Sequence, residues 1–234
     1  YAAFMKEHLE RAVELLTDII FNSTFPQREM EKEIEVVVDE ILSYEDSPQE
    51  LIYDEFEELI FPNHPLGRNI LGQPDCLRAY SSQDALDFTG RHYRPDNMVF
   101  FVKGDVDFKR IVHLVTEFTE PVKWHPLQEG EDALSIPLPP YEPQTRVVHK
   151  ETHQAHVLIG GRAYDAHDER RTALYLLNNL LGGPGMNSRL NIALRERRGL
   201  VYNVESNLTS YTDTGTWCIY FGCDFEDVER CLQL

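Results

Sequence analysis

Residues 30–41 read Met30-Glu31-Lys32-Glu33-Ile34-Glu35-Val36-Val37-Val38-Asp39-Glu40-Ile41 and lie in a helix predicted over residues 27–44. Its core face repeats apolar side chains at helical spacing: Ile34, Val37, Val38, Ile41 and Leu42. At about 100° per residue, Glu33 and Glu40 project within about 20° of each other. They share a flank at the edge of the apolar surface, where a carboxylate can serve as a metal ligand or a general base. A solvated acidic helix face explains the same spacing.

The remainder of the first half is also predicted to be mainly helical. Met98-Val99-Phe100-Phe101-Val102 is a short apolar run bounded by polar turn residues, which is typical of a buried strand. Further helices are predicted over residues 9–20, from Ser47 onward, and over residues 82–93 and 108–118. Helices with a strand between them favour an α+β arrangement.

Six prolines lie within residues 121–143, which predicts a linker and a domain boundary near residue 135. The pattern of elements then starts again. It predicts strands over 146–150, 155–160, 201–209 and 216–222, and helices over 168–181 and 188–198. The fold class expected is therefore α+β with two tandem domains, residues 1–134 and 135–234, both incomplete at the chain ends.

The composition excludes some classes of function. The chain has 40 acidic and 22 basic side chains and a net charge of −18, with most of the excess in the first 60 residues. A nucleic-acid partner is not expected, because phosphate binding needs a basic face. No apolar run approaches the roughly 18 residues of a membrane span. Four cysteines without a Cys-x-x-Cys pattern favour a cytoplasm-like compartment, with organellar and periplasmic locations left open.

Two motifs that suggest ligand binding have simpler explanations. Gly182-Gly183-Pro184-Gly185 lacks the Gly-Lys-Ser/Thr of a phosphate loop, so we interpret it as a turn between two helices that needs a positive φ. His149, His153 and His156 resemble a metal cluster, but on a strand the first two face one side and the third faces the other.

Arg195 and Tyr202 flank Gly199 at a predicted junction between a helix and a strand. There a fixed cation and a phenol could meet a peptide carbonyl or a developing oxyanion. A purely structural role for both side chains remains an alternative at this point.

Four segments in order resemble the pitrilysin/insulinase family of zinc metallopeptidases, the inverzincins. The first is residues 30–41, which look like the helix of the distal glutamate. The others are Tyr93-Arg94-Pro95-Asp96-Asn97-Met98 with Gly104-Asp105, then Gly182-Gly183 through Ser188-Arg189-Leu190, and Leu194-Arg195-Glu196-Arg197-Arg198-Gly199-Leu200-Val201-Tyr202. The resemblance spans almost the whole chain.

This resemblance implies a fold, an activity and site residues. Family members pair α/β-sandwich-like domains into half of a clamshell that closes around a peptide or an unfolded polypeptide. Zinc is the implied cofactor, with Glu40 as its distal ligand and Glu33 as a second acidic residue that supports catalysis. Arg195 and Tyr202 match the pair brought over the scissile peptide. The implied reaction is peptide hydrolysis, in which zinc polarises the carbonyl and activates water.

The family's His-x-x-Glu-His motif is absent from residues 1–234 and is expected upstream of Tyr1. We therefore expect this piece alone to be inactive and free of zinc. Since Glu40 and the Arg195/Tyr202 pair lie in one chain, a homodimer, a heterodimer or a duplicated chain could complete each site. The alternative is a family member without catalysis that binds peptides or acts as a scaffold subunit of a peptidase complex.

Overall fold

The computed structural model describes residues 1–120, 122 and 136–234. Its internal contacts divide the chain into unit 1, Tyr1–Asp39 with Gln73–Ser135, and unit 2, Glu40–Gly72 with Ile136–Leu234. Helices and a sheet are both present, so the α+β class is confirmed. The boundary near residue 135 and much of the predicted linker lie outside the described residues, and the domain ranges 1–134 and 135–234 stay a prediction.

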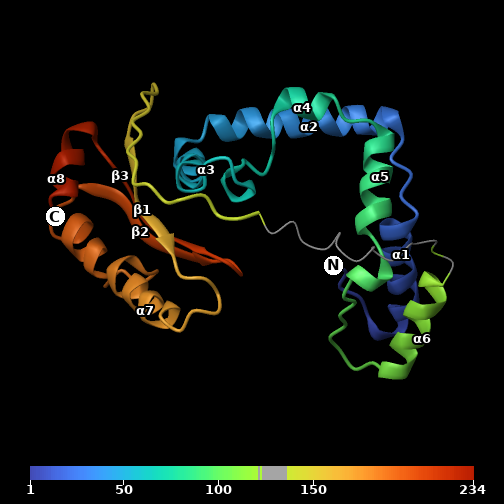
Figure 1. Cartoon of the computed structure of the whole chain (residues 1–234). Coiled ribbons are helices and arrows are strands. Elements are labelled where there is room, and N and C mark those ends of the chain that lie inside the picture. Colours follow the sequence, from blue (N-terminus) through green and yellow to red (C-terminus); the bar gives the residue numbers. More distant parts are fainter. Residues whose placement is uncertain (121, 123–135) are drawn as a thin grey trace. The chain divides into compact units, whose positions relative to one another are not determined.

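Unit 1 is helical in its described part (Figure 1). Its packed centre joins Leu9 and Val13 of one helix to Leu114 of another. A capping box fixes the start of a third helix, because Ser81 and Asp84 exchange side-chain and backbone hydrogen bonds. The helices are α1 (Leu9–Phe21), α2 (Gln27–Glu45, which continues into unit 2), α4 (Pro74–Arg78), α5 (Ser82–His92) and α6 (Phe108–Thr119).

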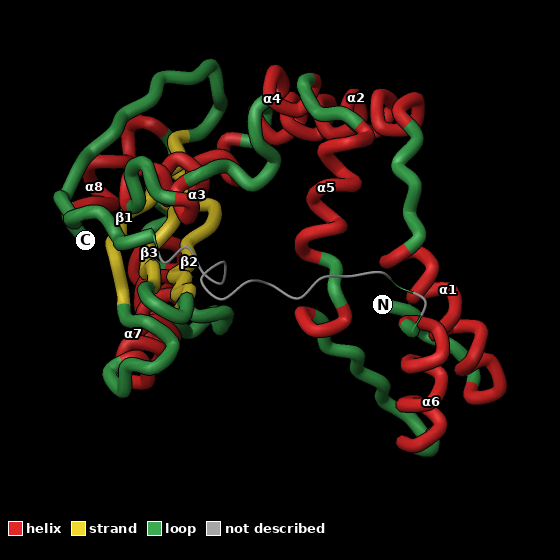
Figure 2. The backbone as a smooth tube through the Cα atoms, turned by 45° about the vertical axis from the view of Figure 1, so that its right-hand side comes forward, coloured by secondary structure: helices red, strands yellow, loops and turns green. Residues whose placement is uncertain are grey.

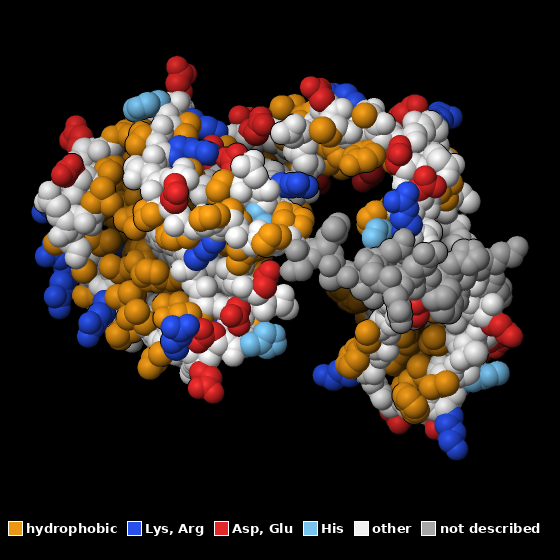
Figure 3. Space-filling model, viewed as in Figure 1, with side chains coloured by type: hydrophobic (Ala, Val, Ile, Leu, Met, Phe, Trp, Pro, Cys, Tyr) orange, Lys and Arg blue, Asp and Glu red, His pale blue; other side chains and the backbone are white. Residues whose placement is uncertain are grey.

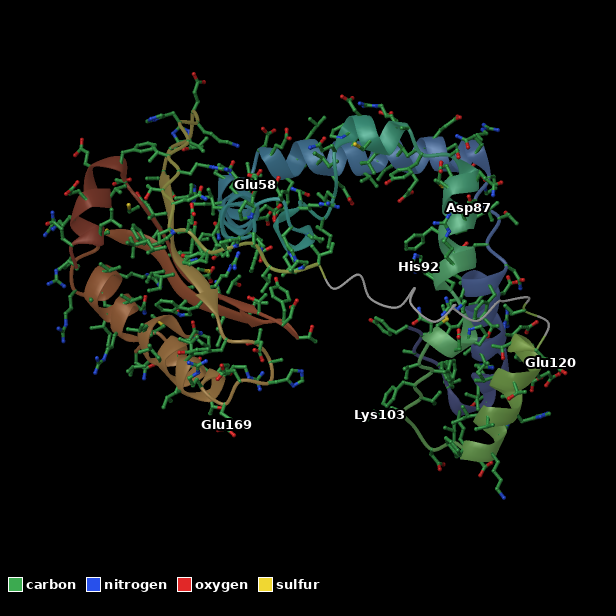
Figure 4. The ribbon with its side chains drawn as sticks, viewed as in Figure 1. Glu58, Asp87, His92, Lys103, Glu120 and Glu169 are labelled. Carbon is green, nitrogen blue, oxygen red and sulfur yellow. The ribbon has the colours of Figure 1, made fainter. Side chains whose placement is uncertain are left out.

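Two predicted strands do not form. Residues 98–102 join no ladder among the described residues, and Val99 and Phe101 are 94% and 81% exposed. Residues 146–150 are also unpaired, and Arg146 instead donates to Glu58, labelled in Figure 4, at 2.7 Å. Both predictions were wrong for the same reason: apolar character favours a strand, but a strand needs a partner.

Unit 2 contains a three-stranded antiparallel sheet (Figure 2). Its strands are β1 (Ala155–Ala163), β2 (Val201–Ser210) and β3 (Gly215–Cys223), in the order β1-β3-β2. The strands predicted in these three places are confirmed. Because β3 is central, β1 and β2 are the edge strands of the sheet in the described part of the chain.

Two helices cover opposite faces of this sheet. Tyr53 of α3 (Pro48–Ile60) donates to Glu205 at 2.7 Å, and its ring lies 5.7 Å from that of Tyr220. On α7 (Arg171–Gly182), Asn178 accepts from Trp217 Nε1 at 3.1 Å and from Ser206. Residues 205 and 206 are neighbours in β2, and neighbours in a strand point to opposite faces. The sheet is therefore the middle layer between α3 and α7.

The main core of unit 2 lies at one end of the sheet. It joins residues of η4, a π-helix over Asn191–Glu196, to β2, β3 and the short helix α8 (Val228–Leu232). Its buried members are Leu194, Leu200, Val201, Val204, Phe221, Cys223 and Cys231. Single 3-10 turns occur at Lys6–His8, Pro65–Gly67, Pro95–Asn97 and Phe225–Asp227. None of the helices in the described residues is long and apolar enough to cross a membrane.

Candidate functional site

The junction between η4 and β2 has unusual backbone geometry. Arg195 lies in the π-helical segment, a form of helix that is rare and frequent at functional sites. Gly199 has a φ of 62°, and its N–H donates to the Arg195 carbonyl at 2.8 Å. This left-handed residue turns the chain from the helix into the strand. Figure 3 shows Lys and Arg side chains along the left-hand edge of unit 2.

Tyr202 occupies a β-bulge. Val201 pairs with Cys223 and Asn203 with Gly222, so Tyr202 is the extra residue of β2. Bulges re-aim side chains, and Tyr202 is 57% exposed whereas Val201 beside it is buried. Its hydroxyl donates to Asp224 Oδ1 at 3.0 Å. This hydrogen bond, and the negative charge of Asp224, raise the pKa of Tyr202 above its ordinary value, so the phenol keeps its proton.

A cavity of about 320 Å³ lies beside Arg195 in unit 2. Arg195, the turn after α7 and one edge of the sheet line it together. The Ser188 side chain is more than nine-tenths buried there, and its hydroxyl has no partner among the described residues. The other lining residues are Gly182, Gly183, Pro184, Gly185, Met186, Asn191, Asn203, Val204, Glu205, Ser206 and Asn207. Residues 203–207 belong to β2, whose outer edge offers unpaired N–H and C=O groups.

The glycine turn lies between α7 and η4, as predicted, but the expected positive φ is wrong: Gly183 has a φ of −63°. Glycine is required there because of close approach. A Cβ on Gly182 would lie 2.7 Å from the backbone nitrogen of Ser206, and one on Gly183 would lie 2.8 Å from Asn179. The turn therefore lies directly against the sheet and its neighbouring helix.

Glu33 and Glu40 both lie on α2, and both are exposed. Neither lines the cavity beside Arg195 or a second hollow of about 720 Å³ between α1 and the end of α6. Carboxylate oxygens are suitable zinc ligands. However, the described residues contain no group of three His, Cys, Asp or Glu side chains that could hold a metal. Glu33 and Glu40 could therefore supply only part of a zinc site, and further ligands would be needed.

The three histidines do not form a cluster on a common strand. His156 is on β1, and its Nδ1 lies 2.8 Å from the Tyr220 hydroxyl. Burial lowers the pKa of His156. His149 and His153 precede β1. The hydrogen bond to Tyr220 gives His156 a structural partner.

Sequence reasoning missed three features of this site. Asp224 and the β2 edge carry no motif, and Ser188 belongs to a segment that resembles the family but was given no role, because each acquires its place through the strand register or through burial. For Asp224 the usable signal was an acidic residue directly after a predicted strand. Arg195 is brought to the cavity, whereas Tyr202 is paired with Asp224 and is not a lining residue.

Comparison with known families decides the relationship. Residues 79–234 match the family model described as "Peptidase M16 inactive domain", and residues 1–74 match "Insulinase (Peptidase family M16)". The chain belongs to the M16 peptidase family. The resemblance to pitrilysin and insulinase is thereby confirmed.

M16 relatives match along nearly the whole chain. An uncharacterized zinc protease of Bacillus subtilis is 35% identical over 231 residues, covering 98% of this chain and 54% of the relative. One from Rickettsia felis is 32% identical over the same shares. The chain thus spans about half the length of the curated relatives it matches.

Solved M16 structures share the fold. A Pseudomonas fluorescens peptidase M16 inactive domain superposes with a TM-score of 0.81 at 20% identity, covering 97% of this chain and 54% of that one. A Helicobacter pylori protease gives 0.78 at 24% identity, covering 94% and 53%.

Replacing Gly199 by alanine should destabilise unit 2 by about 1 kcal/mol, because alanine is strained at positive φ although its Cβ would meet open space. Asparagine tolerates this region better, so Gly199→Asn should lose less. Urea unfolding midpoints measure both. Gly90→Ala is the control, since Gly90 lies within α5 without a positive φ and should gain stability. An unchanged midpoint for Gly199→Ala would contradict the left-handed junction.

Proposed function

We propose that the full-length protein is a zinc-dependent endopeptidase that hydrolyses peptides or unfolded polypeptides in a closed chamber. The observation that carries this proposal is the position of Arg195 in a cavity along the free edge of β2. An extended peptide can join such an edge as an added strand through main-chain hydrogen bonds. The guanidinium of Arg195 then offers N–H donors to a peptide carbonyl.

The acidic residues of α2 would supply the metal side of the reaction. Glu40 would be a zinc ligand through its carboxylate, and Glu33, two turns away on the same flank, would support catalysis. When bound, zinc would polarise the peptide carbonyl and lower the pKa of its water. Arg195 and Tyr202 would hold the peptide in place, and their positions within one unit allow them to act on the same segment.

Completion of the site requires residues beyond this chain. The described part offers fewer than three convergent metal-ligating side chains at any one place. A histidine motif elsewhere in the full-length protein would provide the others. A homodimer, a heterodimer or a duplicated chain would allow Glu40 of one half to meet the Arg195/Tyr202 pair of another.

The alternative is a subunit that binds peptides without cleaving them. The match of residues 79–234 to a model described as an inactive domain favours it. The same cavity and strand edge would then capture a peptide, and the exposed carboxylates of α2 would have no metal to hold.

A chelation experiment on the full-length protein separates the two. An endopeptidase should cleave an unfolded fluorogenic peptide, lose this activity with a zinc chelator, and regain it when zinc is added back. Peptide capture without cleavage by the zinc-supplemented protein would support the binding subunit. Failure to bind or cleave any of a set of unfolded peptides would contradict both.

A further inference from the structure

The hydrogen bond between Tyr202 and Asp224 determines what the phenol can do. A tyrosine hydroxyl has one proton to donate, and here it is directed to Asp224 Oδ1 at 3.0 Å. An ionised carboxylate is a strong acceptor, and hydrogen bonds to it are stronger than those between neutral groups. The phenol oxygen can still accept a hydrogen bond, and Tyr202 is 57% exposed.

Asp224 is held in place by its backbone rather than by its own exposed side chain. It directly follows Cys223, a fully buried member of the unit 2 core. Its carbonyl accepts the N–H of Asp227 at 3.0 Å, which closes the turn after β3. The end of a buried strand and a hydrogen-bonded turn therefore fix the backbone that carries the carboxylate.

The β-bulge brings the two side chains together. In a regular ladder the residue after Val201 would pair directly with Gly222, but the register shift leaves Tyr202 without a partner. The extra residue turns its ring outward at the end of the strand, where the chain leaves β3 at Asp224. The contact between Tyr202 and Asp224 thus depends on the register in which β2 pairs with β3.

We propose that Asp224 is a positioning residue that accepts the hydrogen bond of the Tyr202 hydroxyl, so that the Tyr202 oxygen is left to accept a backbone N–H of the peptide. Carbonyl recognition is left to Arg195, which has only donors. The assignment rests on the proposed function, because it requires a bound peptide. It differs from a role in which Tyr202 donates to the carbonyl, since that role would break the bond to Asp224.

The positioning can be tested without any peptide. Tyrosine labelled with ¹³C in the ring reports phenol ionisation by NMR, and Tyr202→Phe identifies the Tyr202 signal in the full-length protein. Asp224→Asn should lower the phenol pKa of Tyr202 towards its ordinary value. Glu226→Gln removes a nearby exposed carboxylate that is not hydrogen-bonded to Tyr202, and should leave the pKa unchanged. Equal behaviour of the two variants would overturn the positioning role.

The acceptor role needs a peptide series. An alanine-rich fluorescent peptide is compared with analogues in which each amide N–H in turn is replaced by an ester oxygen, using full-length protein stripped of zinc so that nothing is cleaved. The peptide with the ester at one particular position should bind about 3- to 10-fold more weakly, which is the effect expected when a single hydrogen bond is lost. The same ester should have no further effect in Tyr202→Phe and a reduced effect in Asp224→Ala.

Two outcomes would overturn the acceptor role. Tighter binding of the parent peptide by Asp224→Ala, with equal sensitivity to every ester in wild type and Tyr202→Phe, would mean that Tyr202 donates to the peptide. If the full-length protein bound none of the peptides, the proposed function would fail and the acceptor role with it. The phenol titration would still decide whether Asp224 positions Tyr202.

Discussion

Glu40→Gln in the full-length protein is expected to remove zinc and to lower peptide hydrolysis by more than about 100-fold. Glutamine keeps the size of the side chain but has no charge, and zinc ligands from acidic residues bind as carboxylates. Because Glu40 is exposed, its replacement should leave the stability of the fold unchanged within about 0.5 kcal/mol. Zinc per chain after dialysis and the rate of peptide cleavage measure the two effects.

A second glutamate on α2 provides the matched control. Glu31 lies nine residues before Glu40, which places it on the opposite side of the helix at about 100° per residue. Glu31→Gln should keep both zinc and activity, whereas Glu33→Gln should keep zinc and lose activity. Unchanged zinc stoichiometry in Glu40→Gln would exclude Glu40 as a ligand.

Arg195→Ala is expected to lower kcat/KM for peptide hydrolysis by about 100- to 1,000-fold, the loss seen when a donor to a developing oxyanion is removed. Lysine keeps the charge but not the planar pair of donors, so Arg195→Lys should recover only part of the rate. Steady-state kinetics on the zinc-loaded full-length protein give both values.

Arg197→Ala is the control for a change in local charge. Arg197 is exposed, as Arg195 is, and lies one residue beyond η4, but it does not line the cavity. Its loss should change the rate by less than about threefold, since rim charges act mainly through screened, long-range attraction. Equal losses in the two variants would mean that charge at this end of the sheet matters, and not the donors of Arg195.

The sequence predicted the helices and strands whose formation depends on residues close together in the chain. Helices α2 and α5 and the strands β2 and β3 formed where expected, although Leu42 of the predicted core face of α2 is exposed. The apolar run at 98–102 did not become a strand, because apolar composition says nothing about a ladder partner. The glycine turn formed, but for close packing on Ser206 and not for a positive φ.

For the candidate site, resemblance to family motifs named Glu33, Glu40, Arg195 and Tyr202 as candidates and predicted the family, which is confirmed. Only the tertiary structure joined Tyr202 to Asp224, placed β2 at an edge and opened the cavity beside Arg195. Helix periodicity is set by neighbours a few residues apart, which a sequence displays directly. Register, bulges and strand order are set by pairing between distant segments, and these become visible only when the chain is folded.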